Sequence, residues 1–145
     1  DNLDARVKMA PFVPYQELLS WTSSADIGLL PHDPDYSENV RMCLPNKLFE
    51  YAMVGLPVLS SPLVAVNEIM ERYQIGRVAR QLDPASLGHA IGAMANDTAA
   101  LAQMRSNALA AARETLNWET ERRTLIDLYD RLSAERVARL ERRKA

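Results

Sequence analysis

The chain has 145 residues, of which 48% are hydrophobic and 25% charged, a balance typical of one globular domain that can bury a core. The net charge of −2 provides no general attraction for nucleic acid, and the single cysteine, Cys43, excludes an internal disulfide and a multi-cysteine metal cluster. No apolar run approaches the ~20 residues that span a bilayer, so the sequence predicts a cytoplasmic protein.

The first part of the chain alternates between strand-like and helix-like segments. Residues 7–12 have the pattern of a strand, and a helix is expected at about 15–23, where Glu17 suits the first turn. Residues 25–31 form an apolar run of strand length, and residues 32–44 form a polar loop that is unusually long. Long loops that follow strands often carry functional residues.

The same alternation continues through the middle of the chain. A helix is expected at residues 46–54, where Gly55 ends it, and a buried strand is expected at 57–61. A short helix at 67–73 and a further strand at 75–79 follow. Strands that alternate with helices predict an α/β fold with a doubly wound parallel sheet, helices on both faces and ligands beyond the carboxyl ends of the strands.

The last third of the chain is expected to be helical. Asp83 is a candidate N-cap with proline after it, and residues 98–116 are rich in alanine and other good helix formers. A long helix is expected to begin near residue 118. Its apolar stripe consists of Leu125, Leu128, Tyr129 and Leu132.

The stretch LPNKLFEYAMVGLPVLSS, residues 44–61, carries the clearest chemical signal. A helix N-terminus can bind an anion through its free N–H groups, and Lys47 adds a full positive charge. Glu50 can accept two hydrogen bonds from a vicinal diol such as a ribose, so a nucleotide diphosphate is a coherent ligand. The alternative is an exposed Lys47–Glu50 pair worth about 0.3–0.5 kcal/mol, and spacing alone favours this alternative.

Several segments together resemble the C-terminal lobe of family 4 of the GT-B glycosyltransferases. They are VPYQELLSWTSSADIGLLP, LPNKLFEYAMVGLPVLSS, the short helix after it and the strand IGRVA, so that the similarity covers residues 7–132. It is greatest to members that build bacterial surface polysaccharides and share a P-x-K-x-x-E-Y signature. The resemblance implies a Rossmann-like lobe that holds a nucleotide-sugar donor and an N-terminal lobe that holds the acceptor. It also implies retention of anomeric configuration and no obligatory metal or other cofactor.

The resemblance also suggests roles for individual residues. Glu50 matches the second glutamate of the E-x7-E motif, which is associated with the donor ribose, and Lys47 is expected near the diphosphate. Met42 stands where the first glutamate usually lies, so the catalytic residues are left unassigned. The remaining donor-site candidates are Glu38 and Asn39 in the long loop, Ser60 and Ser61 after the following strand, and Glu68 on the next helix.

The resemblance further implies a domain organisation. Residues 1–132 are expected to be part of the donor-binding lobe and residues 133–145 a helical tail. A complete lobe of this family would begin with two more strands, two helices and a glycine-rich loop, so the chain is expected to be a piece of a longer enzyme that is inactive alone. The tail from residue 131 carries six basic and two acidic side chains, which suit either contact with the inner face of the cell membrane or a solvated helix end.

The expected partners are a nucleotide diphosphate-sugar donor and an acceptor sugar or lipid-linked saccharide, with no nucleic acid. Two other classes of protein stay open at this point. A sugar-nucleotide 2-epimerase shares the two-lobed fold, but the stretch NKLFEY, residues 46–51, is closer to the transferase pattern. A non-catalytic, doubly wound binding module is the other alternative, and it gives Lys47 and Glu50 no specific purpose.

Overall fold

The structure is a computed structural model of the chain, and it describes residues 6–142 except for the side chains of residues 137, 138, 140 and 141. Its centre is a three-stranded parallel sheet with the strand order β1-β2-β3, which confirms the expected α/β fold. The strands are β1 (Gly28–Leu30), β2 (Val58–Ser60) and β3 (Gly76–Val78). The helices are α1 (Tyr15–Ser23), α2 (Glu38–Arg41), α3 (Asn46–Met53), α4 (Val64–Tyr73), α5 (Pro84–Asn96), α6 (Thr98–Glu114) and α7 (Trp118–Arg142).

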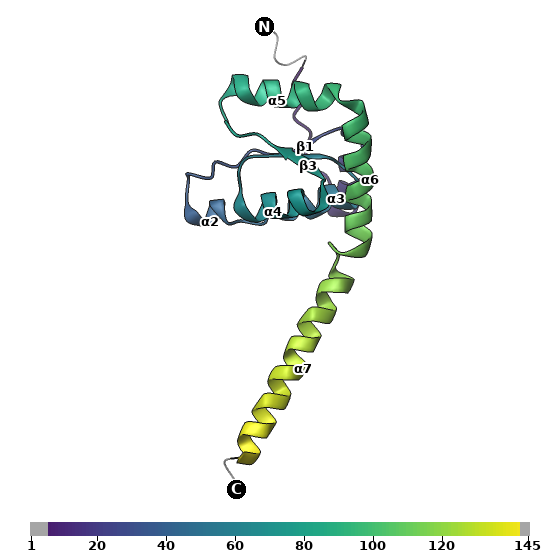
Figure 1. Cartoon of the computed structure of the whole chain (residues 1–145). Helices are drawn as coiled ribbons and strands as arrows, with labels where there is room; N and C mark the ends of the chain where they lie inside the picture. The colour runs from purple at the N-terminus through teal and green to yellow at the C-terminus, as the bar shows by residue number, and fades with distance from the viewer. Residues whose placement is uncertain (1–5, 143–145) are drawn as a thin grey trace.

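Helices cover both faces of the sheet. Figure 1 shows α5 on one side and α3 and α4 on the other, with α6 running past the sheet from one layer to the other. Neighbouring residues of β2 supply the two cores because side chains alternate between the faces of a strand. Val58 belongs to the core beneath α3 and α4, and Leu59 packs in the other core with Met94 of α5. Helix α6 joins both cores, contributing Ala108 to the first and Met104 to the second.

Gly55 ends α3 as the sequence predicts. Its φ angle is +68°, a left-handed conformation that glycine adopts without a steric penalty. The N–H of Gly55 donates to the carbonyl of Ala52 at 3.1 Å, and the N–H of Leu56 donates to the carbonyl of Tyr51 at 2.8 Å. These two bonds form a Schellman motif, which satisfies the last carbonyls of α3 and turns the chain into β2.

Two aspartates cap the helices of the second half. Asp83 accepts hydrogen bonds from the N–H groups of Ala85 and Ser86 at the start of α5, which confirms its predicted role. Asp97 caps α6 by accepting from the N–H of Ala100 and also forms an ion pair with Arg77 of β3. This second aspartate therefore links the edge strand β3 to the helix that serves both cores.

Three sequence predictions differ from the structure, one of them because the expected loop at residues 32–44 contains the short helix α2. Residues 7–12 do not form a strand; they are extended and exposed, with Phe12 94% and Met9 91% accessible to solvent. Within the described residues β1 pairs with β2, and no other strand lies beside it. An extended segment without a pairing partner has neither backbone hydrogen bonds nor burial to hold it as a strand. Helix α4 begins at Val64, three residues before the expected start.

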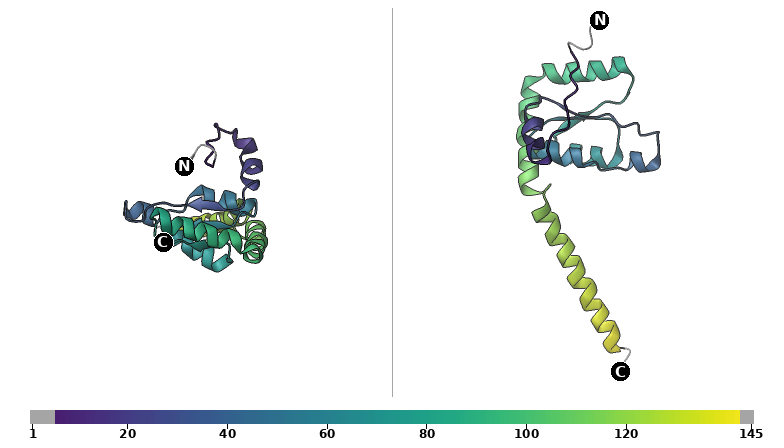
Figure 2. Two further views of the ribbon diagram at one scale, coloured as in Figure 1. Left: turned by 90° about the horizontal axis from the view of Figure 1, so that it is seen from above. Right: turned by 180° about the vertical axis from the view of Figure 1, so that it is seen from behind.

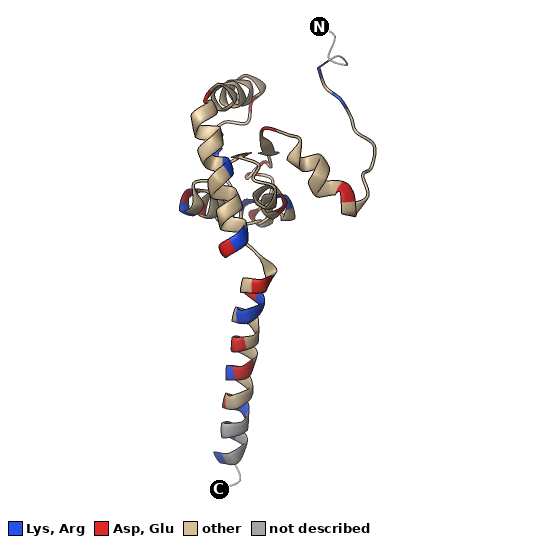
Figure 3. Cartoon of the chain, turned by 90° about the vertical axis from the view of Figure 1, so that its right-hand side faces the viewer, with Lys and Arg blue, Asp and Glu red and all other residues tan. Residues whose placement is uncertain are grey.

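Helices α1 and α7 lie outside the layers. Helix α1 contacts α3, whereas α7 extends away from the sheet as one long helix (Figure 2). It runs without a break through the expected domain boundary after residue 132. Acidic and basic residues alternate along it (Figure 3), and its predicted apolar stripe is exposed, with Tyr129 at 64% and Leu132 at 50%.

Replacing Gly55 with alanine should destabilise the fold. The left-handed backbone alone should lower the free energy of unfolding by about 1–2 kcal/mol, and the new Cβ would lie 2.8 Å from Cγ of Leu109. Gly88→Ala in α5 is the control, because a Cβ there meets nothing within 4 Å. Urea denaturation should show a loss for Gly55→Ala and none for Gly88→Ala, and equal effects would contradict the role assigned to Gly55.

Replacing Asp97 with asparagine should change how stability depends on pH. The hydrogen bond from Arg77, together with that from the N–H of Ala100, holds the pKa of Asp97 below its ordinary value of 3.8. A lowered folded-state pKa stabilises the protein above the ordinary pKa, and this contribution is lost as pH falls through the folded-state value. Asp97→Asn can still cap α6 but loses the ion pair, so it should be less stable at pH 7.

Urea denaturation between pH 7 and pH 2.5 checks this prediction. The difference between the wild type and Asp97→Asn should shrink once the pH falls below about 4. A difference that stays constant over the whole range would show that the charge of Asp97 contributes nothing to stability.

Candidate functional site

The three parallel strands end at one edge of the sheet, and the candidate site lies there. Each strand is followed by a segment that leads into a helix whose N-terminus begins at the same edge. A pocket of about 520 Å³ lies beyond these ends. Its lining consists of Pro31, Asp33, Pro34, Asp35, Pro62, Arg80 and Leu82. Ligands of parallel α/β folds bind at this edge, so the position agrees with the sequence expectation.

The N-terminus of α3 has no side-chain cap. Pro45 occupies the N-cap position and has no side chain that can accept a hydrogen bond. The N-termini of α2, α5 and α6 differ, because Ser37, Asp83 and Asp97 accept hydrogen bonds from their backbone N–H groups, whereas α1 and α4 also lack a side-chain cap. The first turn of α3 therefore presents backbone donors and the positive end of the helix dipole without an acceptor from a neighbouring side chain.

Lys47 and Glu50 do not pair with each other. Lys47 is exposed and Glu50 is half-buried, and no ion pair or side-chain hydrogen bond joins either of them to another described residue. The helical repeat turns both away from Leu48 and Ala52, the two residues of α3 that are fully buried. The structure therefore does not form the exposed ion pair that was the alternative interpretation, and both charged groups are available to a ligand.

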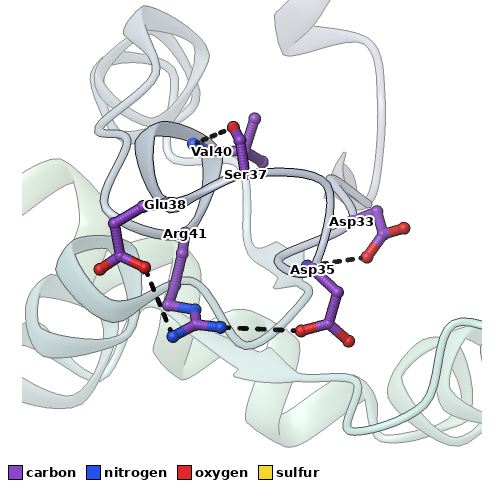
Figure 4. A network of polar contacts seen from close by, with 6 residues as sticks. All are labelled: Asp33, Asp35, Ser37, Glu38, Val40 and Arg41. Atoms are coloured by element: carbon purple, nitrogen blue, oxygen red, sulfur yellow. Dashed lines mark hydrogen bonds and ion pairs between the residues drawn. The ribbon is translucent and has the colours of Figure 1, made fainter.

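The long loop holds its own charges in a local network (Figure 4). The side chain of Asp33 accepts a hydrogen bond from the N–H of Asp35 at 2.9 Å, and Ser37 caps the short helix α2. Arg41 forms ion pairs with Glu38 at 3.5 Å and with Asp35 at 3.8 Å. The carboxylate of Glu38, a donor-site candidate, is thus already bound to an arginine within the loop.

The other loop positions named from the sequence are open to solvent. Asn39, on the short helix α2, is exposed. Met42, at the position of the missing glutamate, follows α2 and is 51% exposed.

Ser60 and Ser61 are buried and directed toward the backbone. The hydroxyl of Ser61 donates to the carbonyls of Leu30 at 3.2 Å and His32 at 2.5 Å, although one proton can serve only one of them at a time. The hydroxyl of Ser60 donates to the carbonyl of Ser61 at 2.9 Å. The bonds of Ser61 tie the carboxyl end of β2 to the end of β1 and the start of the long loop after it.

The seven donor-site candidates predicted from the sequence do not lie together in the pocket at the strand ends. They are Glu38, Asn39, Lys47, Glu50, Ser60, Ser61 and Glu68. Glu68 is exposed on α4, Lys47 and Glu50 lie on α3, and none of the seven lines this pocket. Arg80 does line it and was missed from the sequence. Its position two residues after the end of β3 was the signal that could have identified it, because such positions lie at the ligand-binding edge.

Two further properties concern the described part of the chain. No group of three or more His, Cys, Asp or Glu side chains there is arranged to hold a metal ion. No helix among the described residues has both the length and the apolar character needed to cross a membrane.

Comparison with known proteins supplies the family. A sequence model described as glycosyl transferases group 1 matches residues 1–97. The chain is 27% identical over 132 residues to the amylovoran biosynthesis glycosyltransferase AmsK of Erwinia amylovora. This alignment covers 91% of the chain and 32% of AmsK, so the chain spans about a third of the length of this relative. No solved structure matches the chain.

The family match covers two thirds of the chain and includes the segment that carries Lys47, Glu50 and the parallel strands β1 to β3. It agrees with the resemblance derived from the motif around residues 44–61. The chain therefore belongs to the family of glycosyl transferases group 1.

Proposed function

We propose that the chain is the donor-binding part of a retaining glycosyltransferase that transfers a sugar from a nucleotide diphosphate-sugar to an acceptor. The observation that carries this proposal is the N-terminal half of α3. Its first turn has no side-chain cap and bears Lys47, Glu50 follows one turn later, and neither charged group forms an ion pair with another described residue. Family membership supports transferase chemistry over the 2-epimerase and the non-catalytic module. The name of AmsK supports a role in the biosynthesis of a surface polysaccharide or glycoconjugate.

In this proposal α3 holds the nucleotide part of the donor. Its N-terminal N–H groups and the ammonium group of Lys47 bind the diphosphate, and the carboxylate of Glu50 accepts hydrogen bonds from the ribose hydroxyls. As the bond to the sugar breaks, negative charge grows on the leaving diphosphate. Fixed donors at that position stabilise this charge without rearranging during the reaction.

The loop residues would have a supporting part in the same proposal. Glu38 and Asn39 are exposed on α2, the helix before α3 in the chain, and would approach the sugar, with Glu68 on α4 as a further contact. Ser60 and Ser61 would support the donor site indirectly, because their hydroxyls hold the backbone at the ends of β1 and β2 in place.

The acceptor is proposed to be a sugar or a lipid-linked saccharide, bound by a part of the protein that this chain does not include. The relative AmsK is about three times as long as the aligned segment, which fits a second lobe and fits a chain that is inactive alone. The basic end of α7 would allow contact with the inner face of the cell membrane, where a lipid-linked acceptor is found.

Replacing Glu50 with alanine should weaken nucleotide binding. In the full polypeptide that contains this chain, the loss should be about 1.5–3 kcal/mol, as for hydrogen bonds that involve a charged group. A thermal-shift screen of UDP-, GDP-, dTDP- and CMP-sugars selects the nucleotide, and calorimetry then measures its affinity. Glu71→Ala, which removes an exposed carboxylate from α4, is the control. An unchanged affinity for Glu50→Ala would remove this residue from the site.

Replacing Lys47 with methionine should affect the diphosphate more than the nucleoside, because the ammonium charge is proposed to act on phosphate oxygens. Calorimetry with the nucleoside diphosphate and with the free nucleoside separates the two contributions. Lys8→Met is the matched control, since Lys8 lies in the exposed segment before α1. Equal losses for both ligands would argue against a phosphate-binding role.

A further inference from the structure

Tyr51 follows Glu50 directly, and its ring lies against the backbone of β1. A Cβ atom added to Gly28 would lie 2.5 Å from Cδ2 and 2.6 Å from Cε2 of Tyr51. Real Cβ atoms do not approach other atoms so closely, so the ring occupies the place that any other residue at position 28 would fill. Gly28 and Tyr51 therefore form a close contact between the first strand and α3.

The hydroxyl group of Tyr51 reaches the edge of β1 that faces away from β2. The N–H of Gly28 and the carbonyl of Leu30 bond toward β2, so the carbonyl of Leu29 points to the opposite edge. The Tyr51 hydroxyl lies 3.5 Å from this carbonyl oxygen and donates to it weakly. Burial raises the pKa of Tyr51 above its ordinary value of 10.0, and the nearby charge of Glu50 raises it further.

This contact restricts the rotation of α3 about its own axis. Leu48 packs in the core with residues of β1 and β2, Ala52 is also buried, and the ring of Tyr51 adds a flat contact with β1 on one side of the helix. Glu50 is the neighbouring residue, and Lys47 lies one turn before Tyr51 on the same flank. A small roll of α3 would therefore move both proposed ligand groups together.

We propose that Tyr51 is a positioning residue for the nucleotide diphosphate site, and that its ring, seated on Gly28, fixes the direction of Glu50 and Lys47. This inference rests on the proposed function. It assigns to the tyrosine an indirect role, because its own hydroxyl is directed at the backbone of β1.

Replacing the ring should weaken ligand binding more than it disturbs the fold. In the full polypeptide, Tyr51→Leu should lower the affinity for the selected nucleoside diphosphate about tenfold, because small displacements of binding groups have large effects. Tyr51→Phe keeps the ring and should restore affinity to within about twofold of the wild type, since the lost hydrogen bond is long. Tyr73→Leu is the matched control, because both tyrosines pack at the border of the same core.

The contact with Gly28 can be tested by a double-mutant cycle. Gly28→Ala should displace the ring and weaken binding about as much as Tyr51→Leu. In a Tyr51→Ala background the added Cβ has room, so the same change at position 28 should have little further effect on affinity. Such non-additivity is the signature of direct coupling between the two residues.

Each outcome decides the proposal when affinity is measured well below the melting temperature of each variant. A lower affinity for Tyr51→Leu and Gly28→Ala, with an unchanged affinity for Tyr73→Leu, supports it. Wild-type affinity in Tyr51→Leu overturns it, even where Glu50→Ala binds weakly and the proposed function stands. An equal loss in Tyr73→Leu also overturns it, because the effect would then be general destabilisation. A wild-type protein that binds no nucleoside diphosphate overturns both.

Discussion

The pairing of β2 with strands on both of its sides is the constraint on which the rest of the structure depends. The N–H of Gly28 donates to the carbonyl of Pro57, the N–H of Val58 donates to the carbonyl of Ile75, and the N–H of Ala79 donates to the carbonyl of Ser60. The three residues of β2 are buried, and the side chains of Val58 and Leu59 pack in the cores on the two faces of the sheet. Burial of each large apolar side chain contributes about 1.5–3 kcal/mol, so this short strand stabilises far more than its length suggests.

Parallel pairing also determines where the candidate functional site lies. It brings the carboxyl ends of all three strands to one edge, where the long loop, the N-termini of the helices and Arg80 gather. The hydroxyls of Ser60 and Ser61 stabilise this edge by donating to backbone carbonyls at the ends of β1 and β2. Helices α2, α5 and α6 receive a cap from a side chain, whereas α1, α3 and α4 do not, and of these three uncapped helices only α3 carries a lysine, Lys47, in its first turn. A protein that binds an anionic donor has a physical reason for that difference.

The parts of the site that could be predicted from the sequence are those determined by residues that are close together in the chain. The motif at residues 44–61 predicted α3, its end at Gly55 and the charged residues Lys47 and Glu50, and the family assignment followed from it. The sequence left open whether Lys47 and Glu50 pair with each other, and it did not predict that Glu38 binds Arg41. These outcomes depend on side-chain directions that spacing along a helix leaves open.

The sequence by itself determined the features that arise from neighbouring residues. Asp83 and the proline after it begin α5, Gly55 ends α3, and the alternation of apolar runs with helical periods defines a parallel α/β fold, because capping and left-handed turns act within a few residues. Tertiary structure decided the rest. Residues 7–12 have strand-like composition but no strand beside them, and a strand forms only with a hydrogen-bonding neighbour. The contact of Tyr51 with Gly28 joins residues far apart in the chain, so only the packing of α3 on the sheet could bring them together.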